Sequence, residues 1–334
     1  AMRSTSLALL VACVAGCATL TQDSLLDQRF GPADPSRFDR PATPPPGGVS
    51  YQRDVRPVLE NRCVVCHGCY DAPCQLKLGS WEGIARGATK ALVYDGTRLL
   101  EAPPTRLFVD AQLPSQWRQK DFHPVLNERT PTPENNLAAS VLYRSLALKK
   151  AHPLPDEPVL SGAFDFSLDR AQTCARLGEF DAYERDHPLA GMPYGLPGLA
   201  PRELDVVTRW LATGAPFDAA PAPPAHVARQ VKDWEQFLNG SSLKEQLMSR
   251  YLYEHLFLGH LVFEDDAHHQ SFRLVRSTTA PGKPVVPVAT RRPYEDPGVA
   301  RVYYRLEPER ETILAKTNMP YQLSAQRMSK YRGW

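Results

Sequence analysis

The sequence predicts a mainly α-helical protein of two regions, and three observations lead to this prediction. Apolar residues recur at helical spacing in residues 51–62, 135–150, 204–211 and 234–263. Proline accounts for 32 of the 334 residues, about twice its usual share, so we expect long irregular connections between helices. A Pro-rich linker at 18–48 precedes a first region (49–217), and a second linker at 218–228 separates it from a second region (229–334).

Composition narrows the classes of protein to which the chain can belong. Apolar residues make up 43% and aromatic residues 9% of the chain, which excludes a largely disordered protein. Lys and Arg total 39 against 37 Asp and Glu, for a formal net charge of +2. Because nucleic-acid binding needs a strongly basic face, we expect no nucleic-acid partner.

Residues 1–17 have the pattern of an export signal. Arg3 gives a short positive start, and residues 7–15 are apolar apart from Cys13. The segment then ends in Val14–Cys17, which resembles a bacterial lipobox, in which the cysteine becomes the lipidated first residue. The sequence therefore predicts a periplasmic protein with a lipid anchor at Cys17, the alternative being a cleaved signal with incidental cysteines.

Three helices are expected in the first region. The helix over 51–62 leads into a cysteine cluster, the helix over 135–150 follows Pro133 and stops before Pro153, and the helix over 204–211 is followed by Gly214. The stretch between the first two is rich in glycine and proline and carries no regular pattern.

The second region is expected to be an incomplete α+β unit. Residues 234–263 predict one long helix, whose last third is apolar nearly all round and hence buried. Its Tyr251 and His255, four residues apart, share a face and are expected to pack in the core. Residues 272–276 and 299–306 predict strands, and 323–332 a helix after which the chain stops, as in a truncated protein.

The most specific motif of the chain is Cys63–His67, with the sequence Cys-Val-Val-Cys-His. In c-type cytochromes two such thiols bind the haem vinyl groups, and the adjacent histidine is an axial ligand of the iron. The motif predicts one covalent haem c on Cys63, Cys66 and His67. A zinc site is the alternative, because Cys69 and Cys74 follow closely, but export favours haem.

Haem c usually has a second axial ligand, commonly methionine. Met192 precedes Pro193 in a loop followed by a helix, Trp210 and a Gly-Ala-Pro sequence, which resembles the C-terminal half of bacterial cytochrome c domains. We therefore predict a split cytochrome c-like haem domain with Met192 as the second iron ligand. A large irregular insertion over about 75–187 is expected between its halves, because the two segments that resemble them, the cysteine motif and the Met192 loop, are about 100 residues apart. Met319, which also precedes a proline, is a weaker rival.

Three further cysteines have no fixed pairing at this point. Cys69 and Cys74 can form a disulfide in an oxidising compartment, with Cys174 free or replacing one partner. All three can equally be buried, inert thiols.

Four segments together resemble the bacterial fatty acid cis/trans isomerases. They are the extended haem segment Cys63–Lys77, with its Cys-Tyr-Asp-Ala-Pro-Cys sequence, and the segments Trp81–Ala88, Tyr251–Leu258 and Thr317–Tyr321. The resemblance implies a periplasmic haem c enzyme that converts cis-unsaturated acyl chains of membrane lipids to trans, with His67 acting through the haem iron. Members of this family are considerably longer, so the resemblance identifies this chain as an N-terminal portion.

The implied chemistry suits a haem, since withdrawal of electron density from a C=C bond lowers its order and allows rotation. The resemblance implies unsaturated fatty acids or phospholipid acyl chains as substrates and a membrane surface as partner. The competing hypothesis is a periplasmic cytochrome c-type electron-transfer or binding module. The second region argues against it, because a simple electron carrier does not need about 110 further residues.

Overall fold

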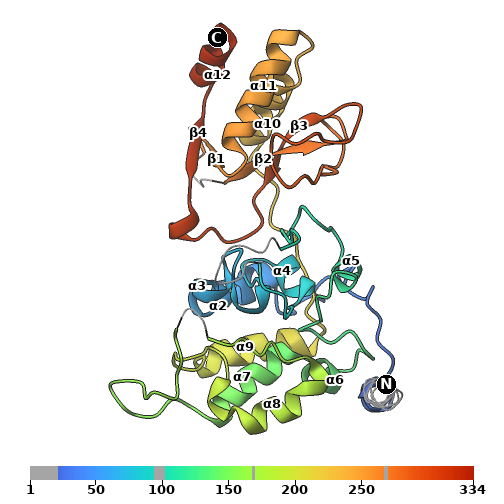
Figure 1. Ribbon diagram of the computed structural model, residues 1–334, viewed down its shortest axis with the longest axis vertical. Helices are drawn as coiled ribbons and strands as arrows, with labels where there is room; N and C mark the ends of the chain where they lie inside the picture. The colour runs from blue at the N-terminus through green and yellow to red at the C-terminus, as the bar shows by residue number, and fades with distance from the viewer. Residues whose placement is uncertain (1–21, 94–101, 168–169, 267–269) are drawn as a thin grey trace, which may run out of the picture. The chain divides into compact units, whose positions relative to one another are not determined.

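The computed structural model describes residues 22–93, 102–167, 170–266 and 270–334, and the chain divides into two compact units (Figure 1). Among described residues, unit 1 comprises 22–67, 71–93 and 113–218, and unit 2 comprises 68–70, 102–112 and 219–334. The described residues are mainly helical and hold one four-stranded mixed sheet. The export signal expected at 1–17, with Cys17, lies outside them.

Unit 1 consists of short helices joined by irregular segments. Residues 22–30 are helical. The others are η1 (Tyr51–Val55), α2 (Arg56–Arg62), α3 (Val64–His67), η2 (Pro73–Gln75), α4 (Trp81–Arg86), α5 (Pro114–Arg118), α6 (Pro133–Ala138), α7 (Val141–Ala151), η3 (Leu177–Glu179), α8 (Phe180–Asp186), η4 (Pro188–Ala190) and α9 (Pro201–Ala212).

The helix expected over 135–150 is in fact two helices, α6 and α7. The Ser140 hydroxyl accepts a hydrogen bond from the Tyr143 amide at 3.1 Å and so caps a new helix start. The helices expected at 51–62 and 204–211 are present as η1 with α2 and as α9.

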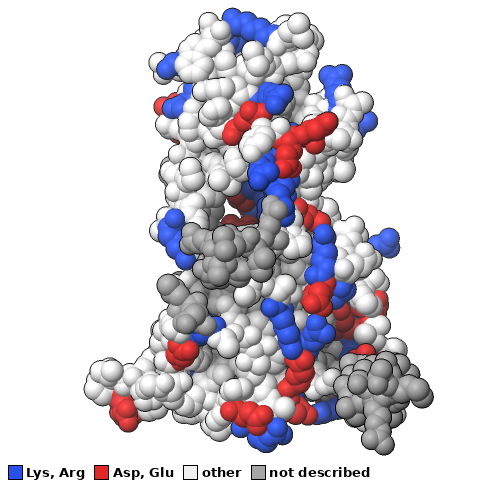
Figure 2. Space-filling model, viewed as in Figure 1, with Lys and Arg blue, Asp and Glu red and all other residues white. Residues whose placement is uncertain are grey.

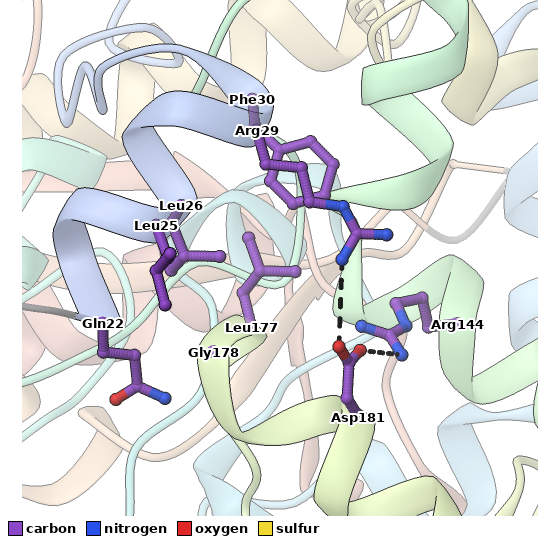
Figure 3. Close-up of a pocket in the computed structure, with 9 residues that line it drawn as sticks. All are labelled: Gln22, Leu25, Leu26, Arg29, Phe30, Arg144, Leu177, Gly178 and Asp181. Atoms are coloured by element: carbon purple, nitrogen blue, oxygen red, sulfur yellow. Dashed lines mark ion pairs between the residues drawn. The ribbon is translucent and has the colours of Figure 1, made fainter.

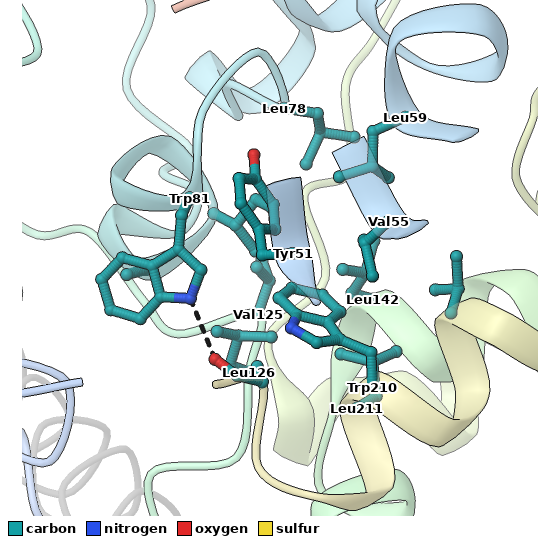
Figure 4. Packing of buried hydrophobic residues seen from close by; sticks show 14 of the residues in the cluster. Tyr51, Val55, Leu59, Leu78, Trp81, Val125, Leu126, Leu142, Trp210 and Leu211 are labelled. Atoms are coloured by element: carbon teal, nitrogen blue, oxygen red, sulfur yellow. Dashed lines mark hydrogen bonds between the residues drawn. The ribbon is translucent and has the colours of Figure 1, made fainter. Parts of the chain in front are cut away.

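Aromatic residues form the centre of the unit 1 core (Figure 4). Tyr51 and Trp210 are almost fully buried with ring centroids 5.8 Å apart. The indole nitrogens of Trp81 and Trp210 donate to the carbonyls of Ala215 and Pro216, each at 2.9 Å. Each buried indole N–H thus has a partner, which removes the cost of burying it.

The prediction of an irregular insertion over 75–187 needs correction. Helices α4 to α8 lie in this stretch. Its Ile84, Val125 and Leu146 belong to the same buried cluster as Tyr51 and Trp210. The stretch is therefore part of the unit 1 core. Its helices are too short, and the segments between them too irregular, for a periodic pattern to predict this.

Residues 22–48, predicted as a linker, are instead a packed part of unit 1. Phe30 and Phe38 are buried there. The Arg37 guanidinium donates to the carbonyls of Asn127 and Arg129 at 2.6 and 2.9 Å. This segment is therefore held by both apolar burial and hydrogen bonds.

Unit 2 packs helices against the four-stranded sheet. Its elements are α10 (Ala225–Leu238), α11 (Leu243–Leu256), β1 (His260–Phe263), β2 (Phe272–Ser277), β3 (Tyr303–Pro308), η5 (Ala315–Thr317), β4 (Pro320–Leu323) and α12 (Ala325–Gly333). The strand order is β3-β2-β1-β4, with β1 parallel to β4 and the other pairs antiparallel. In register, Leu261 pairs with both Phe272 and Tyr321.

The single long helix predicted over 234–263 is wrong. The Ser242 hydroxyl accepts from the Glu245 amide at 3.2 Å while Glu245 accepts from the Ser242 amide at 3.0 Å, and this capping box starts α11 anew. The last apolar residues form β1, where burial alternates so that Leu261 and Phe263 face the core. Short apolar runs fit a buried strand as well as a helix, so their sequence alone did not separate the two.

Candidate functional site

The Cys63–His67 motif forms one tight turn at the end of α2. The amides of Cys66 and His67 donate to the Cys63 carbonyl at 3.2 and 3.0 Å. Cys63 is half-buried and Cys66 is exposed, and both are free thiols. The local fold therefore gathers the two thiols and the imidazole predicted to hold haem.

The His67 imidazole has a fixed orientation. Its Nδ1 lies 2.9 Å from the carbonyl oxygen of Leu76. Since a carbonyl only accepts hydrogen bonds, Nδ1 carries the proton and Nε2 keeps its lone pair. A histidine that binds a metal typically donates its other N–H in this way to a backbone carbonyl or carboxylate.

Burial sets the protonation of the motif. His67 is 8% exposed, and this burial lowers the pKa of its imidazole, which keeps the ring neutral near pH 7. Burial also raises the pKa of the Cys63 thiol to about 12. The imidazole is thus in the state that an iron ligand requires.

The residues of this turn fit a covalent haem c. They supply two free thiols beside a neutral histidine, and the Leu76 carbonyl leaves Nε2 as the ring nitrogen available to an axial iron bond. The sequence could not identify Leu76 as a partner, because the acceptor is a backbone carbonyl that any residue provides.

The zinc alternative does not fit as well. Within the described part of the chain, no three His, Cys, Asp or Glu residues gather in a way that could hold a metal ion. Cys74, one of the expected zinc ligands, is bonded to another cysteine. Cys69 is a buried free thiol.

The two candidate methionines lie in different units. Met192 belongs to unit 1, like His67, and packs against the same hydrophobic core as Cys63. Its amide donates to the Ser145 carbonyl at 2.9 Å, and its peptide bond to Pro193 is cis. Met319 belongs to unit 2 and is 59% exposed.

A disulfide joins Cys74 to Cys174, so Cys174 replaces Cys69 as the partner of Cys74, which was one of the pairings left open by the sequence. The Cys74 amide also donates to the Gln172 side chain at 2.7 Å. These bonds tie residues 172–174 to the loop that carries the Leu76 carbonyl. The disulfide thus braces the loop that orients His67.

Tyr251 and His255 share a face of α11, as the spacing predicts, with ring centroids 4.1 Å apart. Both are exposed, so the expectation that they pack in the core is wrong. The His255 Nδ1 lies 2.7 Å from the Tyr251 carbonyl within the same helix. Among the described residues, no group of metal ligands forms around this pair.

A pocket of about 410 Å³ lies between the helix at 22–30 and the start of α8 (Figure 3). Leu25, Leu26 and Leu177 line its apolar side. Arg29 and Arg144 both point to the Asp181 carboxylate, at 3.8 and 2.7 Å. Because Arg144 also pairs with Glu184, carboxylates already neutralise these cations, and we assign the pocket no role in the reaction.

Comparison with known families decides the class of the protein. The model of the fatty acid cis/trans isomerase (CTI) family matches residues 102–334. The chain belongs to the fatty acid cis/trans isomerase family. The resemblance seen in the sequence is thereby confirmed, and the protein is an enzyme, an isomerase.

The CTI match begins after the Cys63–His67 turn and covers α5 to α12. The haem assignment therefore depends on the motif and on the geometry around His67. No curated protein and no solved structure matches the chain. Among the residues described, no helix combines the length and apolar character needed to cross a membrane.

Proposed function

We propose that this CTI protein converts cis-unsaturated acyl chains of membrane lipids to trans, at a haem c bound through Cys63, Cys66 and His67. The observation that carries the proposal is the hydrogen bond from His67 Nδ1 to the Leu76 carbonyl, which presents Nε2 as a ligand. The family match supplies the reaction and the fatty acyl substrate class.

The reaction is a rotation about one C=C bond, so no atom enters or leaves and the double bond keeps its position. When bound, the haem supplies an iron centre that draws electron density from the π bond and so lowers the barrier to rotation. The trans isomer is lower in energy, and the reaction therefore needs no ATP.

The side chains of unit 1 hold and tune this centre. Cys63 and Cys66 would anchor the macrocycle, and His67 would bind the iron through Nε2. Met192 would be the second iron ligand in this proposal, because it packs against the same core as Cys63. Thioether ligation favours ferrous iron and raises the reduction potential, which strengthens electron withdrawal.

The proposal includes export to the periplasm and lipid attachment at Cys17. The Cys74–Cys174 bond supports export, because structural disulfides persist in oxidising compartments and are rare in the cytosol. The same compartment is where c-type haem is attached.

The decisive test is the trans-to-cis ratio of membrane acyl chains, measured by gas chromatography of methyl esters after expression with a haem-maturation system. We expect the ratio to rise with the wild-type protein and to stay at background with His67→Ala. His152→Ala, which changes an exposed histidine on the same unit, is the control and should leave the ratio high. A protein that binds haem and exchanges electrons without changing the ratio would favour the electron-transfer alternative.

Haem attachment and the second ligand are tested separately. Haem-peroxidase staining after denaturing electrophoresis should show a band that disappears in the variant with both Cys63→Ala and Cys66→Ala. Met192→Ala should abolish the ferric thioether–iron absorption band, whereas Met319→Ala should retain it. The opposite result would transfer the ligand role to Met319.

A further inference from the structure

Helix α11 carries a line of exposed apolar side chains. Leu243 is 84% exposed, Leu247 70% and Tyr251 48%. Their spacing of four residues places them one above another along the helix. The opposite face, with Leu252 and Tyr253, is buried against the unit 2 core. We call Leu243, Leu247 and Tyr251 the apolar stripe.

The neighbouring helix α10 shows that this arrangement is specific to α11. Its apolar residues Val227, Trp234, Phe237 and Leu238 are buried and Val231 is partly buried, and its outward positions are largely polar. Helix α11 instead has apolar residues on both faces. Exposing two leucines to water has a cost that α10 avoids.

The exposed apolar surface continues past the end of α11. Phe257 is 37% and Leu258 is 64% exposed in the turn before β1. Met319, 59% exposed, adjoins this turn, because its carbonyl accepts from the His260 amide at 2.9 Å. The stripe and this turn therefore form a longer apolar edge on unit 2.

Basic residues stand at the other end of the stripe. Helix α12 has Arg327, Lys330 and Arg332 and no Asp or Glu. The pKa of Glu245, in the first turn of α11, is lowered by the Ser242 hydroxyl and, more weakly, by Arg332, so the basic end of α12 lies beside that turn. In Figure 2, blue side chains stand among uncharged surface at the end of unit 2 where α11 and α12 lie.

A tryptophan completes this surface. Trp334 is 55% exposed, and the Lys330 ammonium lies 5.2 Å from the centre of its ring. Tryptophan and lysine together are typical of proteins at a membrane–water interface, where the ring sits among the headgroups and the ammonium meets phosphate.

We propose that the apolar stripe of α11, together with Lys330, Arg332 and Trp334, docks on an anionic phospholipid bilayer. An amphipathic helix that lies in a membrane surface has such a line of apolar side chains with basic residues beside it. The basic segment complements anionic headgroups, and the leucines enter the acyl region. This inference rests on the proposed function, since it delivers the enzyme to substrate chains that lie in the same bilayer.

Co-sedimentation with vesicles tests the docking surface. The proteins compared carry Cys17→Ala, so that no attached lipid contributes to binding. In this background the variant with Leu243→Gln and Leu247→Gln should bind vesicles of phosphatidylethanolamine and phosphatidylglycerol at least tenfold more weakly than the chain with both leucines. Both positions are exposed, so the fold should be retained. The matched control changes Val286→Gln and Val299→Gln, two exposed apolar residues elsewhere on unit 2, and should bind like wild type.

A second variant tests the contribution of the basic side chains to vesicle binding. Lys330→Gln with Arg332→Gln should weaken binding to these anionic vesicles by about fivefold for each charge removed, and added salt should reduce the difference. Binding to uncharged phosphatidylcholine vesicles should not change. Unchanged binding of the leucine variant to anionic vesicles would overturn the proposal, as would a stripe that instead proves to hold two copies of the chain together by sedimentation velocity.

Activity measurements separate this proposal from the proposed function. The leucine variant should lose isomerisation of vesicle phospholipids but keep isomerisation of a free cis-monounsaturated fatty acid dispersed in detergent. If the wild type isomerises neither substrate yet binds vesicles through Leu243 and Leu247, the docking surface stands and the proposed function falls. If both substrates are isomerised equally by the leucine variant, docking through the stripe is wrong.

Discussion

The two units of this CTI protein differ in covalent bracing. Among the described residues only unit 1 has a disulfide, whereas each unit has a largely buried ion pair, Arg118–Glu128 in unit 1 and Glu235–Arg305 in unit 2. Unit 1 has a covalent cross-link, Cys74–Cys174, between residues 100 apart in sequence. Unit 2 has a buried ion pair, in which the Glu235 carboxylate accepts from the Arg305 Nε at 2.9 Å, with side chains 6% and 8% exposed. A cross-link acts mainly by restricting the unfolded chain, whereas a buried pair acts in the folded state.

The ion pair of unit 2 is also well satisfied. Glu235 accepts a second bond from the Leu306 amide at 2.9 Å, and the Arg305 guanidinium donates to the Ala280 carbonyl at 2.9 Å and the Lys283 carbonyl at 3.1 Å. It therefore joins α10, β3 and the loop after β2. The difference teaches that the stability of the unit with the haem motif depends on redox conditions as well as on charge pairs, whereas the described residues of unit 2 are held by non-covalent contacts.

Removing the cross-link should have the largest effect. Cys174→Ser should lower the free energy of unfolding of unit 1 by about 4–5 kcal/mol, because a loop of about 100 residues is no longer closed. Hydrogen exchange measured by mass spectrometry on peptides from each unit should show the loss in unit 1 alone. Cys69→Ser, which removes a buried free thiol, is the control for loss of sulfur and should have a much smaller effect.

Breaking the ion pair should be nearly as costly, but in unit 2. Glu235→Ala leaves the Arg305 guanidinium buried without its carboxylate and should cost about 3–5 kcal/mol. The control is Glu254→Ala, which removes the surface pair Arg250–Glu254, worth under about 1 kcal/mol. Equal rates of amide hydrogen exchange in unit 2 of the two variants would show that the buried pair contributes little to the free energy of unfolding.

Acid should act on unit 1 through His123. Burial lowers the pKa of His123 to about 4, and neither ring nitrogen has a hydrogen-bond partner among the residues described. Between pH 6.5 and 4 the unfolded chain takes up a proton at His123 that the folded chain does not, so stability falls as pH falls. The loss should be about 2 kcal/mol at about pH 5 and approach about 3 kcal/mol near pH 4.

Urea unfolding followed by tryptophan fluorescence, at neutral pH and at about pH 5, measures this effect. His123→Gln should remove that part of the pH dependence, and His152→Gln, at an exposed position, should leave it in place. An identical pH dependence in wild type and His123→Gln would exclude His123 as its source.

The smallest effect is expected at the start of α11. Ser242→Ala removes the hydroxyl that caps the helix and should cost about 1 kcal/mol, confined to unit 2. Ser241→Ala, at the exposed position just before the cap, should be close to neutral. Exchange of the first amides of α11 reports the change directly.

The sequence predicted the parts of this protein whose signals are local. The helices before the Cys63–His67 motif and at α9 follow from apolar spacing and end signals, and the family follows from several short segments. The break between α10 and α11 was missed although its signals are local. Asn239–Gly240 marks a turn, and Ser242 with Glu245 has the spacing of a capping box, but the apolar residues on both sides were given more weight.

Other features depend on contacts between distant residues. The acceptor of His67 is a backbone carbonyl, and the partner of Cys74 is a cysteine 100 residues away. The pattern also could not show that Leu243 and Leu247 face outward, since α11 has apolar residues on every side. Tertiary packing determines these partners and the exposure of these side chains, and the apolar periodicity of a sequence reflects tertiary packing only in part.

The Cys74–Cys174 bond has a consequence for any protease that meets this chain. It makes a covalent ring of the residues between the two cysteines, which includes an exposed stretch at 155–163. A nick in that stretch opens the ring but releases no fragment, so the segment with Cys63–His67 and the segment with Met192 remain one molecule. The two segments that carry the candidate iron ligands would separate only after both proteolytic cleavage of the chain and reduction of the disulfide.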